Sequence, residues 1–495
     1  MQDRTPPARP DPLSVSAEHP GPRRAAGRGV SIQTAFPQPE LLDLPWSVAL
    51  AQWPDDVLVA YPRGISRHVV RFAQVGERVL AAKETTARNA AREYEMLRRL
   101  RQLGTPSVVP VAVVTDRHAP DGEELPAVLL TEHMAFSLPY RVLFSGNPDA
   151  EIAEKLVDAL ALLLVQLHLA GFYWGDVSLS NTLFLRDAGA FAACLVDAET
   201  GEIHPRLTVG QRRYDLDLAR TNVAGELMDL LAAFEQGQDP AEVRGDASWS
   251  DAARSDPTGP EASGSEAGPH DRDDGTADTA AGTETRYEPA ASTAALMAVT
   301  NDSGEPTPPV DPFETSERLV ATYDSLWEEL TGEERFPHEQ KWRVARRVER
   351  LQELGFDVEE ASLDTDDDGI VRLIPRVVEP GHHARQLRSL TGLSARENQA
   401  RRILADIQQY GRALYPGLPE DITASLWKQE VFAPMMAAVP RDLRAKREPA
   451  EIVHEVLEHR WFLSERAKRD VATDRATADY LESQLRRRPD EQMML

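Results

Sequence analysis

The chain has 495 residues, 41% of them hydrophobic, and its formal net charge is −26 at pH 7. A chain this acidic repels phosphate backbones and anionic bilayers, so we expect no nucleic-acid partner. The single cysteine, Cys194, excludes an intramolecular disulfide and favours a reducing, cytoplasmic location. The most apolar run, residues 156–171, contains polar side chains and is short for a bilayer, so we also expect no membrane span.

A leader of residues 1–35 is expected to be disordered, because it is rich in proline and arginine and lacks the apolar core of a secretory signal. Residues 36–236 are expected to form the first domain. Its first half alternates apolar and polar residues in the manner of strands, and a helix is predicted from about Thr86 to Gln102. Five antiparallel strands are predicted: Asp56–Pro62, Arg67–Val75, Arg78–Glu84, Val108–Val114 and Ala127–Thr131.

The second half of this domain is predicted to be mainly helical. Glu151 to Ala170 is apolar almost all round, which implies a helix buried at the domain centre. Asp217 to Phe234 is a second helix. Two short strands, Asn181–Leu185 and Phe191–Val196, are predicted between these helices.

Residues 237–311 separate this domain from the rest of the chain. They contain no isoleucine or phenylalanine, and their 16 acidic and 4 basic residues give a net charge of −12. Such a segment cannot bury enough apolar surface to offset the entropy of ordering, so a disordered acidic linker is expected. A mostly helical α+β domain, residues 312–486, should follow. We predict helices at 313–331, 338–355, 395–414, 420–438 and 449–484, and a hairpin from Asp357–Leu363 and Ile370–Val378.

Lys83 ends one of the predicted strands. Period-two geometry places its side chain on one face with Val79 and Ala81, where the small alanine leaves space for a base and the amine can reach phosphates. A half-buried lysine needs a carboxylate partner. The next helix offers Glu93 on its apolar face and Glu95 on its polar face, so we predict that Glu93 pairs with Lys83 and that Glu95 is solvated.

Three further polar residues follow in the order that phosphoryl transfer requires. Asp176 and Asn181 lie five positions apart in a loop, so their side chains can turn toward one point. Asp176 would accept or orient the hydroxyl of an acceptor, and Asn181 would bind magnesium. An apolar run then places Asp197 at the end of a strand, where a second magnesium ligand is needed.

The motif Gly175-Asp176-x4-Asn181, followed by Leu195-Val196-Asp197, resembles the catalytic and metal-binding loops of the protein-kinase-like superfamily. The variant is most similar to the bacterial lipopolysaccharide kinase (Kdo/heptose kinase) and aminoglycoside phosphotransferase branch. The resemblance covers about residues 56–236 and implies a two-lobed α+β fold that uses ATP and magnesium. Residues 313–486 resemble a bacterial domain of unknown function that accompanies such kinases.

The resemblance also implies roles for residues around these loops. Asp217 would brace the catalytic loop from the following helix, with Asp215 as the less favoured candidate. Glu199 would be a further metal ligand, in an Asp-Ala-Glu sequence typical of the small-molecule branch. Trp174 departs from the family, which usually has histidine before Gly-Asp. Trp174 and the Asp-Ala-Glu sequence argue against a protein acceptor more than against nucleotide binding.

Two segments would bind the nucleotide. Residues 131–134 would form the hinge, where backbone groups of Glu132 and Met134 face adenine. Gly64 and Ser66 lie in the loop that would cover the phosphates, although this loop keeps only one glycine.

The preferred hypothesis is a phosphotransferase that moves the γ-phosphate of ATP to a hydroxyl of an unknown small-molecule, sugar or protein acceptor. The alternative is a pseudokinase that binds nucleotide or acts as an interaction module. A third interpretation, in which the C-terminal domain carries the function and the kinase fold regulates it, has no support from individual residues.

Three other motifs favour ordinary structure. The run from Asp364 to Gly369 begins like a calcium loop, but its twelfth position is Pro375 instead of glutamate, so a polar turn is predicted. His454 and His459 miss the zinc-protease spacing by one residue and indicate a solvated helix. The adjacent pair His382-His383 lacks further ligands and is predicted to lie in a polar turn.

Overall fold

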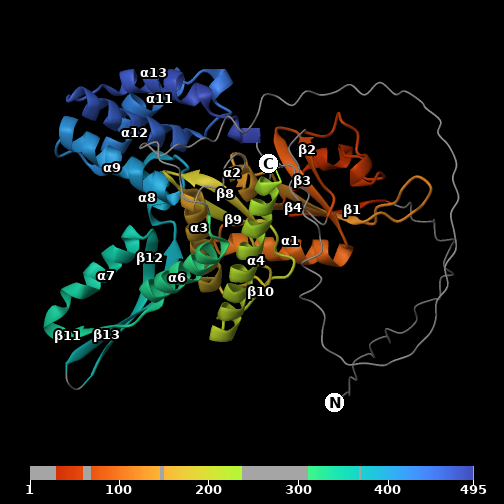
Figure 1. Cartoon of the computed structure of the whole chain (residues 1–495), viewed down its shortest axis with the longest axis horizontal. Helices are drawn as coiled ribbons and strands as arrows, with labels where there is room; N and C mark the ends of the chain where they lie inside the picture. The colour runs from red at the N-terminus through yellow and green to blue at the C-terminus, as the bar shows by residue number, and fades with distance from the viewer. Residues whose placement is uncertain (1–28, 60–67, 145–149, 237–309, 367–368, 494–495) are drawn as a thin grey trace, which may run out of the picture.

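The computed structural model describes most of the chain, and the described residues are 29–59, 68–144, 150–236, 310–366 and 369–493 (Figure 1). Most of the expected leader and linker, together with Gly64 and Ser66, lie outside the described residues. Within the described part, no helix is both long and apolar enough to cross a bilayer.

The first lobe is built on a five-stranded antiparallel sheet with the order β1-β4-β5-β3-β2. Its strands are β1 (Ser31–Thr34), β2 (Val70–Val75), β3 (Arg78–Thr85), β4 (Pro110–Thr115) and β5 (Ala127–Glu132). The end of the expected leader therefore supplies an edge strand. By contrast, the expected strand Asp56–Pro62 contributes only the bridge between Leu58 and Ala73 within the described residues.

Both faces of this sheet are covered. Helix α1 (Ala87–Gln102) packs its apolar face, including Tyr94 and Leu97, on one side. On the other side lie two short 3-10 turns, Pro39–Asp43 and Leu50–Gln52, with the buried Trp46 between them. No helix or strand was predicted for this covering segment. Burial of its apolar side chains, such as Leu41, Trp46 and Leu50, against alternate strand residues explains its order.

One buried ion pair fixes this covering segment to the sheet. The Arg117 guanidinium, with a fully buried side chain, lies 3.0 Å from Glu84 on β3. It also donates to the backbone carbonyls of Trp46 and Val48. Because all of these partners are buried or half-buried, the pair is well satisfied and orients the segment before β2.

The second lobe is helical around one buried helix. Helix α3 (Ala150–Leu169) is buried along most of its length, and α4 (Val209–Glu235) lies near it. Between them, β8 (Thr182–Asp187) and β9 (Ala190–Leu195) form a hairpin, with the short β6 (Leu138–Pro139) at its edge. The remaining short elements are α2 (Tyr140–Leu143), β7 (Phe172–Tyr173) and β10 (Glu202–Ile203). The structure confirms the expected α+β, two-lobed architecture.

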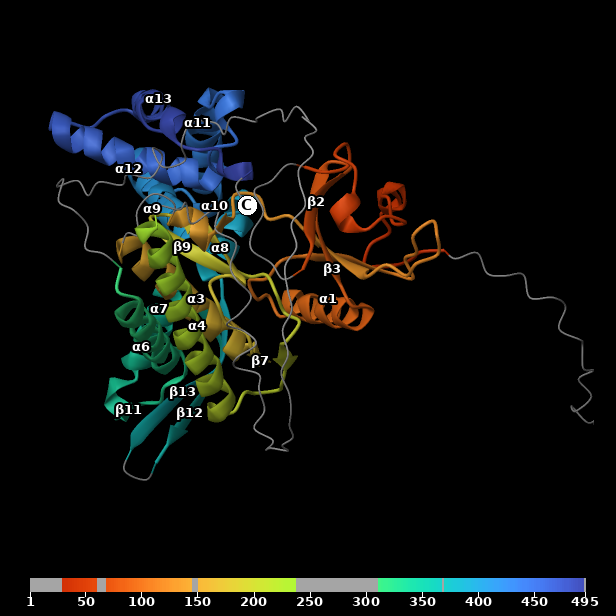
Figure 2. The ribbon, with the colours of Figure 1, turned by 45° about the vertical axis from the view of Figure 1, so that its right-hand side comes forward.

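Helix α6 (Pro312–Thr331) lies beyond the linker in sequence but packs on α3 and α4 (Figures 1 and 2). Its Leu319, Tyr323 and Leu330 belong to the same buried core as α3 and α4. Structurally, the boundary expected at residue 312 therefore does not separate two cores. The core of the second lobe is completed by a helix from the other side of the linker.

A three-stranded sheet and a group of helices follow. The sheet has the order β11-β13-β12, with α7 (Trp342–Glu353) packed against β12. Its strands are β11 (Glu334–Pro337), β12 (Phe356–Thr365) and β13 (Ile370–Pro380). The helices are α8 (His382–Thr391), α9 (Glu397–Leu414), α10 (Glu420–Trp427), α11 (Ala433–Ala438), α12 (Pro449–Ala467) and α13 (Thr473–Ser483). The expected helix 449–484 is two helices, because Lys468 ends α12 in a left-handed conformation with φ of 52°.

The C-terminal helices meet the second lobe at the turn between β8 and β9. The buried Asp187 accepts the backbone N–H groups of Asn398 and Gln399 at the start of α9, at 3.2 and 2.8 Å. A carboxylate at a helix N-terminus satisfies free N–H groups and complements the helix dipole. Arg186, in the same turn, pairs with Glu491 at 2.9 Å. These contacts fix the C-terminal helices to the hairpin that leads to Asp197.

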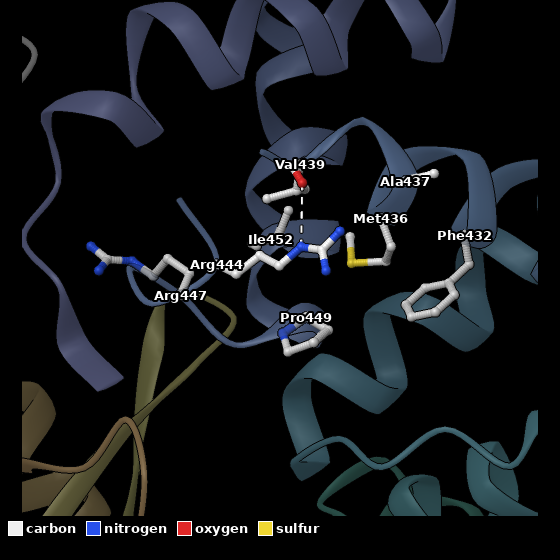
Figure 3. A pocket seen from close by; sticks show the side chains of 8 residues that line it. All are labelled: Phe432, Met436, Ala437, Val439, Arg444, Arg447, Pro449 and Ile452. Carbon is white, nitrogen blue, oxygen red and sulfur yellow. Dashed lines mark hydrogen bonds between the residues drawn. The ribbon is translucent and has the colours of Figure 1, made fainter. Parts of the chain in front are cut away.

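A cavity of about 440 Å³ lies within the C-terminal helices (Figure 3). Arg444 crosses it and donates to the Val439 carbonyl at 3.3 Å. The cavity is mainly apolar and is formed by α11, α12 and the segment around them, so it is separate from the residues that the sequence singled out. Its lining residues are Phe432, Met436, Ala437, Val439, Arg444, Arg447, Pro449 and Ile452.

Candidate active site

Lys83 lies at the centre of a cluster of acidic side chains between the two lobes. Its Nζ is 3.0 Å from Glu93 Oε2 on α1 and 2.7 Å from Asp197 Oδ2, just after β9. Glu199 Oε2 is 3.7 Å away. The structure thus brings together residues from three separate parts of the sequence, as the sequence analysis expected.

Strand and helix periodicity explain how Lys83 and Glu93 meet. On β3, Leu80 and Ala82 are buried under the covering segment, which leaves Lys83 on the opposite face. Helix α1 begins after Thr86, whose side chain caps the Asn89 N–H, and this start sets the helix phase. Glu93 then faces inward and is 2% exposed, whereas Glu95 is 49% exposed.

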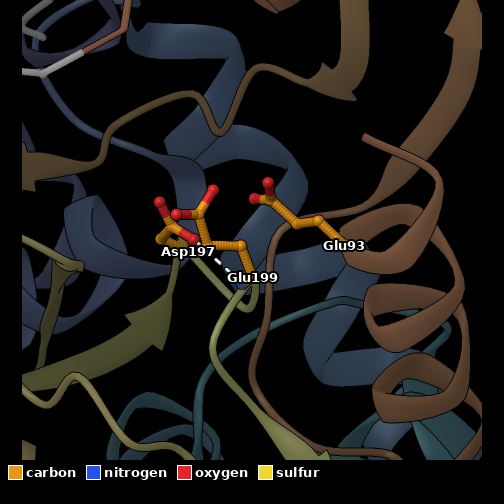
Figure 4. Close-up of side chains that lie close together, drawn as sticks. All are labelled: Glu93, Asp197 and Glu199. Carbon is orange, nitrogen blue, oxygen red and sulfur yellow. Dashed lines mark hydrogen bonds between the residues drawn. The ribbon is translucent and has the colours of Figure 1, made fainter. Parts of the chain in front are cut away.

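The three carboxylates form a site with the chemistry of a divalent-cation centre (Figure 4). One oxygen each from Glu93, Asp197 and Glu199 lies within 4.8 Å of the others. With all groups ionised, three carboxylates and the Lys83 ammonium leave a net charge of −2. Hard oxygen ligands and uncompensated negative charge fit Mg²⁺. Asp197 is held in place because its Oδ1 accepts the Glu199 N–H at 3.0 Å.

The same crowding changes the protonation of Glu93. Burial, and then repulsion from Asp197, raise the pKa of Glu93 from 4.5 to about 8, against the opposing attraction of Lys83. The carboxylates and burial affect Lys83 in opposite directions, and its pKa is raised because attraction by Glu93 and Asp197 outweighs desolvation. Perturbed carboxyl groups of this kind cluster at functional sites.

Glu93 should therefore make stability depend on pH in an unusual direction. Between its ordinary pKa of 4.5 and the folded-state value of about 8, the folded protein binds a proton that the unfolded chain has lost. The free energy of unfolding should then fall as pH rises, by about 1 kcal/mol per pH unit. Urea midpoints measured in EDTA between pH 5.5 and 8.5 test this. Glu93→Gln should lose this part of the slope, and the exposed control Glu95→Gln should keep it; equal slopes in both variants would contradict the assignment.

The loop before β8 carries Asp176 and Asn181. Asn181 Nδ2 donates to the backbone carbonyl and Oδ2 of Asp176 at 3.0 and 3.1 Å, so the two side chains face each other. The Asn181 carbonyl also accepts the Val196 N–H at 3.0 Å, which places the loop beside the residue before Asp197. Gly175 has φ of 74°, and a Cβ there would lie 3.2 Å from the Tyr173 ring. This turn therefore favours glycine immediately before Asp176.

Asp215, and not the expected Asp217, braces this loop. The fully buried Asp215 accepts the Trp174 N–H at 2.9 Å and the Gly175 N–H at 2.8 Å. Asp217 is 75% exposed, and its nearest cation is Arg220 at 3.8 Å on the same helix. The physical reason is helix phase, because position 217 falls on the outward face of α4.

Two further residues of α4 hold the same loop, and the sequence analysis missed both. Asn222 Nδ2 donates to the Val177 carbonyl at 2.9 Å. Glu226 accepts the backbone N–H groups of Leu179 and Ser180 at 2.8 and 2.9 Å. These residues follow Asp215 by 7 and 11 positions, so they lie on one helix face. The sequence did contain a signal for them, because these polar residues recur at helical spacing next to the apolar face of α4.

Trp174 connects the loop that carries Asp176 with the segment that carries Asp197. Its indole Nε1 donates to the Asp197 carbonyl at 3.0 Å, and its side chain is fully buried. Thr200 closes the arrangement by donating to the Trp174 carbonyl at 2.8 Å. Trp174 therefore supplies a ring nitrogen that donates a hydrogen bond to the segment around Asp197.

The expected nucleotide-binding residues are only partly described. Glu132 is the last residue of β5 and pairs with Leu80 on β3, and the chain then runs directly to β6 in the second lobe. The Met134 carbonyl accepts the Ser137 hydroxyl at 2.7 Å. Gly64 and Ser66 lie outside the described residues. A hinge at residues 131–134 fits this position, and its role toward adenine stays a prediction.

Two of the three motifs interpreted as ordinary structure have local hydrogen-bond partners. The third differs from its prediction of a solvated helix, because His454 is buried on α12. Asp366 Oδ1 accepts the Ile370 N–H at 2.8 Å within the β12–β13 turn. His382 Nδ1 lies 2.5 Å from Asp357, and His383 Nδ1 lies 2.6 Å from Glu397. The two adjacent histidines begin helix α8 and do not form the expected polar turn.

Two family models match parts of the chain. Residues 67–228 match the model of the lipopolysaccharide kinase (Kdo/WaaP) family, and residues 325–485 match a domain described as a domain of unknown function (DUF4032). One similar solved structure is "WaaP in complex with acyl carrier protein", at 18% identity and a TM-score of 0.27, covering 38% of this chain and 91% of that one. A search of curated proteins gave no match. The resemblance expected from the sequence is confirmed, and the family match supports a kinase-like phosphotransferase in residues 67–228.

Proposed function

We propose that the protein is an ATP- and magnesium-dependent phosphotransferase that transfers the γ-phosphate to a hydroxyl group. The observation that supports this most is the meeting of Lys83 with Glu93 and Asp197 at 3.0 and 2.7 Å. Phosphoryl transfer depends on positioning and on neutralising charge, and these are the properties of such a cluster. The family match to lipopolysaccharide kinases favours a sugar hydroxyl as acceptor.

Each residue has a role that follows from its chemistry. Lys83 binds phosphate oxygens, and Glu93 holds the Lys83 ammonium in position. Asp197 and Asn181 bind Mg²⁺ with Glu199 nearby; the Asn181 nitrogen donates to Asp176, which leaves the amide oxygen as the ligand atom. The bound Mg²⁺ would neutralise charge on the phosphates. Asp176 orients the acceptor hydroxyl or accepts its proton. ATP and a single free cysteine suit a cytoplasmic location.

ATP turnover measured with and without Mg²⁺ tests this proposal. The wild-type protein should hydrolyse or transfer phosphate from ATP only with Mg²⁺, and Asp176→Asn should lower kcat by about 100-fold. The amide keeps the size of the side chain but cannot accept a proton from the acceptor. Asp229→Asn, an exposed residue of α4, is the matched control and should keep wild-type turnover. Equal rates for both variants would remove Asp176 from the chemistry.

A pseudokinase is the second candidate function. Lys83 already pairs with the oxygen of Asp197 that a metal would need, at 2.7 Å, and this contact favours a state without nucleotide. The two functions differ in thermal shift and turnover. A nucleotide-free module predicts no increase in Tm with ATP and Mg²⁺, and a nucleotide-binding pseudokinase predicts an increase without turnover.

A further inference from the structure

A hydrogen-bonded chain connects helix α6 with the catalytic loop. The Tyr323 hydroxyl on α6 lies 2.7 Å from His168 Nδ1 on α3. His168 Nε2 lies 3.1 Å from Asp215 Oδ2, and Asp215 accepts the Trp174 and Gly175 N–H groups next to Asp176. His168, Asp215 and Tyr323 are all buried, so water does not replace these bonds.

The chemistry of the groups fixes the direction of each hydrogen bond. The Asp215 carboxylate only accepts, so His168 Nε2 carries a proton and donates it. Burial lowers the pKa of His168, so the ring is neutral and Nδ1 is an acceptor. Burial also raises the pKa of Tyr323, so its hydroxyl keeps its proton and donates it to Nδ1. Every donor in the chain then meets one acceptor.

We propose that Tyr323 is a positioning residue for the catalytic loop, and that the polypeptide beyond the linker is therefore a working part of the phosphotransfer site. Through His168, its hydroxyl orients the Asp215 carboxylate that holds the Gly175 turn, and so it sets the position of Asp176. This inference rests on the proposed function for its effect on turnover. Its effect on the loop backbone is independent of that function.

Further contacts around Tyr323 hold α6 where its hydroxyl can reach His168. Trp327 stacks on the Tyr323 ring at 5.8 Å between centroids, and the Arg212 guanidinium lies 4.0 Å above Trp327. Arg318 donates to both carboxylate oxygens of Asp158 on α3, at 3.1 and 2.8 Å. None of these contacts involves the tyrosine hydroxyl, so removing only that hydroxyl should leave the packing of α6 intact.

The bond between Tyr323 and His168 acts on the loop turn at Gly175 and makes no contact at Lys83. The expected consequence is a change in kcat with little change in ATP binding, because the residues that hold ATP lie on other elements.

The test compares Tyr323→Phe with Thr322→Val in the full chain. Both remove one side-chain hydroxyl from neighbouring positions of α6, and each of these hydroxyls bonds to α3. In Tyr323→Phe, hydrogen exchange at the Trp174 and Gly175 amides should be roughly tenfold faster than in wild type. Its kcat should be about tenfold lower, with KM for ATP within about twofold. Thr322→Val should match wild type in all three measurements.

Amide exchange and kcat together distinguish a failure of this inference from a failure of the proposed function. Unchanged amide exchange in Tyr323→Phe overturns the inference, whatever the activity. Faster exchange with unchanged kcat also overturns it, because the loop would then not depend on this bond for catalysis. Absence of turnover in the wild type removes the proposed phosphotransferase alone, and the exchange comparison then decides by itself whether Tyr323 positions the loop.

Discussion

Asp197→Asn is expected to lower magnesium-dependent ATP turnover by roughly 10³-fold or more, because a metal that stabilises phosphoryl charge contributes several kcal/mol to the transition state. Asparagine keeps the shape of the side chain and its hydrogen bond to the Glu199 N–H, but it removes the charge that Mg²⁺ requires. The increase in Tm with ATP and Mg²⁺ should disappear with it. Steady-state turnover and thermal shift measure the two effects.

The stability of the same variant should not fall. Asp197 repels Glu93 and contributes to its raised pKa, so removing this charge relieves that repulsion and offsets the loss of the Lys83–Asp197 pair, while the Lys83–Glu93 pair remains. Functional sites commonly hold such unfavourable charges because activity needs them. Glu202→Gln, an exposed change on β10, is the control and should leave turnover and Tm unchanged. A loss of stability in Asp197→Asn together with normal turnover would contradict the assignment of Asp197.

The sequence predicts the site best where one periodicity decides the position of a side chain. Strand alternation separates Lys83 from the buried face of β3, and helical spacing separates Glu93 from Glu95. The observed contacts follow both patterns, with Lys83 and Glu93 3.0 Å apart and Glu95 bonded to exposed arginines of its own helix. Such local patterns need no knowledge of the rest of the fold.

The choice between Asp215 and Asp217 shows how a repeated motif misleads. Both residues precede leucine, so the motif fits either one. The apolar residues Leu216, Ala219 and Val223 define the buried face of α4, and Asp215 lies beside that face. Helical phase, used as it was for Glu93, would have favoured Asp215.

The contribution of α6 was not predictable from local patterns. The sequence places Tyr323 beyond an acidic segment of low apolar content, which is typical of a boundary between independent domains. Only the packing of α6 on α3 shows that one core extends across that boundary. In the same way, the strand Ser31–Thr34 pairs with β4 although its flanking composition indicates a disordered leader.

Asp215→Asn should be the most destabilising of the conservative changes in the loop region. Its carboxylate accepts three donors, from His168, Trp174 and Gly175, at 3.1, 2.9 and 2.8 Å. An asparagine offers one oxygen, and its NH₂ group must face a donor in a site with no exposure to solvent. Breaking a buried charged network of this kind costs about 3 kcal/mol. Urea unfolding measures the loss.

Asp217→Asn is the matched control, because it makes the same chemical change two residues away on the same helix. Its side chain is 75% exposed, so its free energy of unfolding should stay within about 0.5 kcal/mol of wild type. Turnover should fall in Asp215→Asn, since the turn at Gly175 sets the position of Asp176, and should persist in Asp217→Asn. The reverse pattern would restore Asp217 as the brace and would show that the buried network does not hold the loop.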